Sequence, residues 1–234
     1  MLKLILRSLH IEKFTFWNRR YLWTAILGVV FFLLSMAKVV VLPQGGALTY
    51  FSMLALWLAF FFLDTPGRKH PFLENLIVAL IFGGLRFLAT WLTGEYIEMH
   101  PVCILLEYPV ACGAFALGQL VREPKEPLIP RLRRGQYVLG EPIPDEPWSL
   151  RGGYLVGVFC MFVIYVISAM LFYDWEYPTF FGNLAYSMLY DGSYLGIEAG
   201  VSLIVLAVPQ VANAFYYLKY ISCHEKPDPT LISF

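Results

Sequence analysis

Six apolar stretches constrain the fold of this chain more than any other feature of its sequence. Each approaches the roughly twenty residues that a transmembrane helix needs. Because 59% of the residues are hydrophobic and only 15% are charged, no stretch between them suits a separate soluble domain. The sequence therefore predicts an all-α bundle of six membrane-spanning helices. The predicted spans are residues 21–42, 47–63, 71–94, 101–121, 152–173 and 184–218.

The basic residues predict how this bundle is oriented. If the segments between spans alternate between the two sides, all Lys and Arg residues except Lys38 and Arg86 lie on one side. Cytoplasmic segments of membrane proteins are enriched in Lys and Arg. Both termini are therefore predicted to be cytoplasmic.

The chain divides into one integral membrane domain with basic flanking segments. The N-terminal segment mixes basic and apolar residues, so it either lies on the inner leaflet as an interfacial helix or frays. The long loop 122–151 carries six prolines, which deny it a long helix; it is either a tether or a docking surface. The predicted parts are the segment 1–20, spans at 21–121, the proline-rich linker 122–151, spans at 152–218 and the tail 219–234.

Charged residues at membrane depth are costly and mark candidate functional positions. Lys38 lies near the outer end of its span and is predicted to snorkel. Arg86 has two interpretations: a structural ion pair with Glu107, or contact with an anionic or carbonyl group of a ligand. Asp191 and Glu198 are seven residues apart and share a helical face. Asp191 also begins an Asp-Gly-Ser step that is predicted to loosen or kink its helix.

Glu107 and the abundant aromatic residues suggest a pocket for a cationic, aromatic ligand. Carboxylates accept hydrogen bonds from ring amines, and aromatic faces attract cations. The alternative is that the Tyr and Trp residues only fill the two interfacial belts. His100, Cys103 and Glu107 share a helical face, but one imidazole, one thiol and one acid give too few ligands to predict a metal site. No cofactor and no nucleic-acid partner are expected.

Two segments resemble the thiamine-specific substrate-binding components of energy-coupling-factor (ECF) transporters. The stretch GGLRFLATWLTGEYIEMHPVCILLEYPVACGAFALGQL is similar to the third and fourth helices of that family. The stretch YSMLYDGSYLGIE, residues 186–198, is similar to the family pattern YSLxYNGSYLxPE. The resemblance covers residues 21–218. It implies a six-helix bundle in the bacterial cytoplasmic membrane that binds a vitamin near the outer face. Such components have no ATPase and dock on a module of one transmembrane coupling protein and two ATPases.

The resemblance also implies which residues bind the ligand. Glu107 matches the acid that hydrogen-bonds the aminopyrimidine of thiamine, and Tyr108 follows it in the same pocket. Tyr186 matches a pocket tyrosine of the last helix. Tyr165 takes the place of a family His, and Tyr173 that of a Trp that stacks on the ligand.

Two further positions depart from the family pattern. Asp191 stands where the family has Asn, and an added carboxylate favours a cation. Arg86 stands where a neutral residue is expected, and it opposes a cation unless it is paired. Trp175 is expected to help Tyr173 cover the cationic ring.

The sequence therefore predicts a high-affinity substrate-binding subunit that imports thiamine or a close analogue and is not an enzyme. One alternative is a component of the same class for another heteroaromatic vitamin or precursor. A second is a structural membrane subunit with a buried Arg86–Glu107 pair and no ligand. A third is a small intramembrane enzyme that uses Glu107, His100 and Asp191, although no nucleophile–base pair is apparent.

Overall fold

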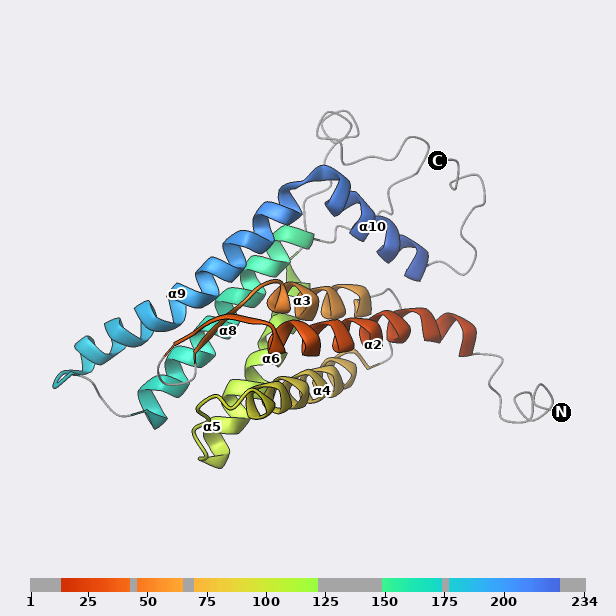
Figure 1. Ribbon diagram of the computed structural model, residues 1–234. Helices are drawn as coiled ribbons and strands as arrows, with labels where there is room; N and C mark the ends of the chain where they lie inside the picture. Colours follow the sequence, from red (N-terminus) through yellow and green to blue (C-terminus); the bar gives the residue numbers. More distant parts are fainter. Residues whose placement is uncertain (1–13, 43–45, 65–69, 122–148, 174–176, 224–234) are drawn as a thin grey trace.

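The computed structural model describes residues 14–42, 46–64, 70–121, 149–173 and 177–223, most of them helical (Figure 1). Most of the basic segment 1–20, of the linker 122–151 and of the tail 219–234 lies outside these residues, as does Trp175. The elements are α2 (Phe14–Met36), β1 (Lys38–Val41), β2 (Ala47–Thr49), α3 (Ser52–Leu63), α4 (Pro71–Leu92), α5 (Pro101–Leu105), the π turn η3 (Leu106–Val110), α6 (Ala111–Ala114), the 3-10 turn η4 (Phe115–Leu120), α8 (Leu150–Phe172), α9 (Phe180–Ala207) and α10 (Pro209–Cys223).

Within the described part of the chain, four helices are long and apolar enough to cross a membrane. They are α4, the rod Pro101–Leu120 formed by α5 to η4, α8 and α9. The apolar part of α2, Tyr21–Met36, and α3 are shorter. The protein is thus a multi-pass membrane protein, and the count of six spans stays a prediction.

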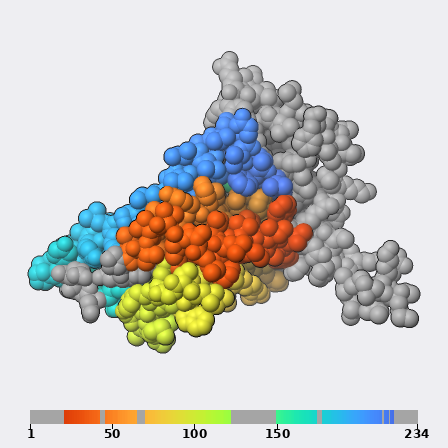
Figure 2. Space-filling model, viewed as in Figure 1, coloured from red at the N-terminus to blue at the C-terminus, as the bar shows by residue number. Residues whose placement is uncertain are grey.

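The all-α prediction is wrong between residues 38 and 49. The first helix ends at Met36 rather than at 42, and β1 pairs with β2 in an antiparallel hairpin in which Val41 faces Ala47. Three successive valines favour an extended strand over a helix. In the space-filling view, α2 and the hairpin (red to orange) lie between α9 above (blue) and the chain around the start of α5 below (yellow-green) (Figure 2).

The short helix α3 forms the centre of the bundle. All twelve of its residues are buried, as expected for a helix that is apolar on every side. Its first turn is held by Glu198 of α9, whose carboxylate accepts bonds from Thr49 Oγ1 (2.7 Å), Ser52 Oγ (2.8 Å) and the Met53 N–H (2.8 Å). A carboxylate at this position is also stabilised by the positive end of the α3 helix dipole. Glu198 therefore stabilises the structure from inside the bundle.

Two polar side chains satisfy the other end of α3. Gln119 Nε2 donates to the Phe60 carbonyl at 2.7 Å, and Lys219 Nζ donates to the Phe61 carbonyl at 2.5 Å. The last carbonyls of a helix have no partner within the helix, and at membrane depth they need one from elsewhere. The bundle can therefore hold a helix that ends inside it.

The rod Pro101–Leu120 widens at the point where Glu107 lies. Pro109 has no N–H to donate, and the Ala111 N–H reaches back five residues to the Leu106 carbonyl. The result is the π turn η3, which carries Glu107 and Tyr108. Such π turns within α-helices often occur at functional sites.

Gly83 allows α4 to approach this π turn closely. A Cβ atom placed on Gly83 would lie 2.5 Å from backbone atoms of Pro109, whereas one on the neighbouring Gly84 would meet nothing within 4 Å. An added side chain would therefore clash with the backbone at Gly83 but not at the adjacent Gly84.

We expect Gly83→Ala to destabilise the fold by about 1–3 kcal/mol, because one of the two helices must shift to accept the methyl group. The matched control, Gly84→Ala, should unfold at the native temperature or slightly above it, since alanine favours the helix. Thermal unfolding of the detergent-purified variants measures both. Equal melting temperatures for the two variants would contradict this packing.

The predicted last span, 184–218, is in fact two helices. α9 ends at Ala207 and α10 begins at Pro209, and Val208 between them is extended (φ −67°, ψ 117°). A residue before proline disfavours the helical conformation. In Figure 1, α10 turns back from α9 toward α2 and α3.

The predicted kink at the Asp191-Gly192-Ser193 step is also wrong, because α9 runs through it without a break. Both polar side chains bond within the helix: Ser193 Oγ donates to the Tyr190 carbonyl (2.7 Å), and Asp191 Oδ1 accepts from Tyr194 (2.9 Å). The helix backbone therefore keeps its own hydrogen bonds.

Candidate ligand-binding cavity

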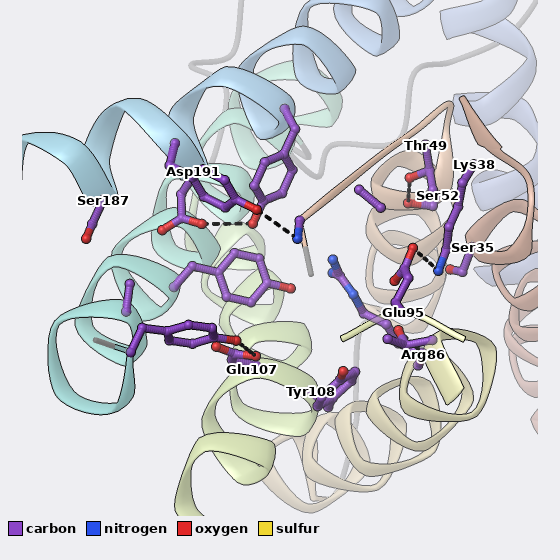
Figure 3. Close-up of a pocket in the computed structure, with 18 of the residues that line it drawn as sticks. Ser35, Lys38, Thr49, Ser52, Arg86, Glu95, Glu107, Tyr108, Ser187 and Asp191 are labelled. Atoms are coloured by element: carbon purple, nitrogen blue, oxygen red, sulfur yellow. Dashed lines mark hydrogen bonds and ion pairs between the residues drawn. The ribbon is translucent and has the colours of Figure 1, made fainter. Parts of the chain in front are cut away.

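A cavity lies at the end of the bundle where α2, α4 and α8 end and where α3, the rod 101–120 and α9 begin (Figure 3). The cavity and the open solvent at its mouth together comprise about 1040 Å³ of empty space. The distribution of basic residues predicts that this end faces outward.

The six residues predicted to bind a ligand all line this cavity, although they come from three separate elements. η3 supplies two, α8 and the residue directly after it supply two, and α9 supplies two. Their role in binding stays a prediction. The six are Glu107, Tyr108, Tyr165, Tyr173, Tyr186 and Asp191.

The Glu107 carboxylate is oriented by two hydroxyl groups, one in α8 and one on the residue directly after it. Ser168 Oγ donates to Oε1 at 3.0 Å, and the Tyr173 hydroxyl donates to Oε2 at 3.3 Å. A carboxylate has about four acceptor positions, so these bonds leave capacity for donors on a ligand. Ser168 was missed from the sequence. Its spacing of three residues from Tyr165 places it on a neighbouring part of the same helical face.

A row of tyrosines on α9 forms another wall. The ring centroids of Tyr186 and Tyr190, and of Tyr190 and Tyr194, are each 6.0 Å apart. Tyr194 bonds to Asp191 Oδ1, and the buried Oδ2 atom of Asp191 has no hydrogen-bond partner among the described residues. Tyr190 and Tyr194 were missed from the sequence, but they lie four and eight residues after Tyr186, a spacing that signals one helical face.

The β hairpin contacts the rim of the cavity at two points. The Gly46 N–H donates to the Tyr190 hydroxyl at 3.0 Å. A Cβ atom on Gly46 would lie 2.6 Å from that oxygen, so a larger residue there would displace the Tyr190 hydroxyl. Lys38 forms an ion pair with Glu95 and donates to Thr93 Oγ1 at 2.5 Å. Lys38 therefore lies in a strand and has an acidic partner, whereas the sequence predicted that it snorkels from a helix.

Arg86 does not pair with Glu107, so the predicted structural ion pair is wrong. The salt bridges among the described residues do not include these two side chains. The Arg86 guanidinium lies over the Tyr165 ring, 5.3 Å from its centroid, and Nη1 lies 4.0 Å from Met161 Sδ. Tyr165 thus contacts the cation, while Ser168 and Tyr173 bond to Glu107. In Figure 3 the two charged groups reach the cavity from different elements.

The His100 side chain caps the start of the rod 101–120. Its Nδ1 accepts a bond from the Val102 N–H at 3.3 Å, which caps the rod, and its ring lies 4.7 Å from that of Phe172. Within the described ranges, no three His, Cys, Asp or Glu side chains cluster as metal ligands do.

Apolar helices long enough to cross a membrane surround a cavity lined by tyrosines and carboxylates, an arrangement that suits a membrane protein for a small polar molecule. A family model described as "Thiamine transporter protein (Thia_YuaJ)" matches residues 21–217. The chain belongs to this family, which confirms the resemblance of its two motifs. It is therefore a transport protein and not an enzyme. No curated protein and no solved structure matches it.

Proposed function

We propose that this chain is the high-affinity thiamine-binding subunit of an ECF-type importer, with six spans and cytoplasmic termini in the bacterial cytoplasmic membrane. The observation that carries the proposal is the position of Glu107. Its carboxylate lies in a cavity of a thiamine transporter family member, oriented by Ser168 and Tyr173. An oriented carboxylate at membrane depth suits a ligand that carries an amino group on an aromatic ring.

The cavity walls suit the two rings of thiamine differently. Glu107 accepts hydrogen bonds from the aminopyrimidine ring, with Tyr108 beside it on η3. The thiazolium ring is a cation, and aromatic faces attract cations. Tyr173 and Tyr186 supply such faces, and Asp191 adds an acceptor with a free buried oxygen. Binding of this kind needs no covalent chemistry.

The proposed dependence on a coupling module comes from the resemblance to ECF substrate-binding components. The full sequence has no phosphate-binding glycine loop of the G-x-x-x-x-G-K-[ST] type, so the chain has no evident means to hydrolyse ATP. The proposal therefore assigns energy coupling to one transmembrane coupling protein and two ATPases, as the resemblance implies.

Uptake of labelled thiamine tests this assignment in bacteria that lack their own thiamine uptake. Three strains express the chain alone, the coupling module alone, or both. We expect ATP-dependent accumulation of thiamine only in the strain that expresses both. The strain with the chain alone should retain only as much thiamine as the expressed chain can bind. Accumulation by the chain alone would show a self-sufficient transporter and would overturn the subunit assignment.

A further inference from the structure

Arg86 is a cation in the cavity wall with few partners. Its guanidinium carries five N–H donors. The described residues offer it the face of Tyr165, at 5.3 Å, and the sulfur of Met161, at 4.0 Å. Neither contact is a carboxylate or a carbonyl oxygen. The donors of Arg86 are therefore available to a molecule in the cavity that it lines.

None of the other charged groups of the cavity forms a salt bridge with Arg86 in the described part of the chain, although the buried Glu198 behind the cavity wall acts on it electrostatically. Lys38 has its own partner in Glu95. Glu107 is held by Ser168 and Tyr173, and Asp191 by Tyr194. A charged group withdrawn from bulk water is costly unless an opposite charge and hydrogen bonds compensate. The aromatic face of Tyr165 supplies only part of that compensation.

The charges also come from different elements. Arg86 belongs to α4, whereas the two acids belong to η3 and α9. A ligand that is only a cation matches the acids and leaves Arg86 opposed. A ligand with a cationic ring and a separate anionic group matches both.

We infer that the cavity selects a thiamine-class molecule that carries an oxyanion, a phosphate ester or a carboxylate, and that Arg86 binds this group. The inference rests on the proposed function and names its ligand more closely. The planar guanidinium suits both groups, because it donates two parallel N–H bonds to a pair of oxygens. Arg86 is thus the residue that distinguishes forms of the ligand that carry an anionic group from forms that lack one.

Equilibrium binding to the native chain tests the inference without any variant. The probes for calorimetric titration in detergent are thiamine, its phosphate monoester, the analogue whose hydroxyethyl arm is oxidised to a carboxylate, and inorganic phosphate. We expect at least one of the two anionic forms to bind about tenfold more tightly than thiamine. The tighter of the two identifies the source of the oxyanion. Inorganic phosphate alone should bind far more weakly.

Variants then assign the preference to Arg86. The measured quantity is the dissociation constant of thiamine divided by that of its tighter-binding anionic form. In Arg86→Gln this ratio should fall to about one. In Arg86→Lys it should be intermediate, because lysine keeps the charge but cannot donate two parallel N–H bonds. The control is Arg151→Gln, whose guanidinium bonds to the Leu206 carbonyl away from the cavity; it should keep the native ratio. A ratio does not depend on how much of the protein is folded.

Two results would overturn the inference, and they differ. If thiamine binds tightly and the anionic forms bind no better, Arg86 does not select an anion, while the proposed function stands. If none of the thiamine forms binds, the proposed function fails and this inference fails with it.

Discussion

Replacement of Glu107 by glutamine should weaken thiamine binding by about 100-fold or more, the largest effect on binding that we expect from one residue. The change keeps the size of the side chain but turns one acceptor oxygen into an NH₂ donor. That donor would face Ser168, Tyr173 or the amino group of the ligand, all of which donate. Radiolabelled-thiamine binding to the purified variant measures the loss.

The control for this prediction is Glu98→Gln. Glu98 accepts a bond from Tyr96 at 2.8 Å and does not line the cavity, so thiamine should bind this variant as it binds the native chain. Two results would count against the assigned role of Glu107: native affinity in Glu107→Gln, or loss of the fold in that variant. Loss of the fold would favour a structural role.

Glu198→Ala should cause the largest loss of stability, about 3 kcal/mol or more. The change removes the acceptor shared by Thr49, Ser52 and the Met53 N–H at the start of the buried helix α3. Buried donors without an acceptor are costly. Thermal unfolding should show a strongly lowered melting temperature, with Glu198→Gln between the native chain and Glu198→Ala.

The neighbouring Ile197 provides the matched control. Its side chain is 52% exposed on the outer surface of the bundle, where lipid surrounds a membrane protein, so Ile197→Ala should change stability little. An equal effect at the two positions would mean that the Glu198 network does not stabilise α3.

The apolar stretches predicted three helices closely. The expected spans 71–94, 101–121 and 152–173 correspond to α4, the rod Pro101–Leu120 and α8. Length and hydropathy are local properties, and they suffice where a helix crosses the bundle without interruption. They do not suffice at the hairpin, where valines continue an apolar stretch in a different conformation. They also miss the break before Pro209, although that proline is a visible helix-breaking signal.

The candidate site was predicted less evenly. Sequence motifs brought Glu107 and Asp191 into one proposed pocket, and the structure places both in one cavity. The predicted Arg86–Glu107 pair failed because the choice of partner depends on which side chains α8 presents to each group. The role of Glu198 was missed for a similar reason, since its partners lie about 150 residues earlier in the chain.

Thiamine titration of the native, detergent-purified chain, followed by its intrinsic Trp and Tyr fluorescence, tests the central claim most directly. The cavity is lined by tyrosine rings, so a bound ligand should quench their emission. The account predicts saturable quenching at submicromolar thiamine with one molecule bound per chain. No saturable response to thiamine or to its anionic forms, together with no binding by calorimetry, would contradict it.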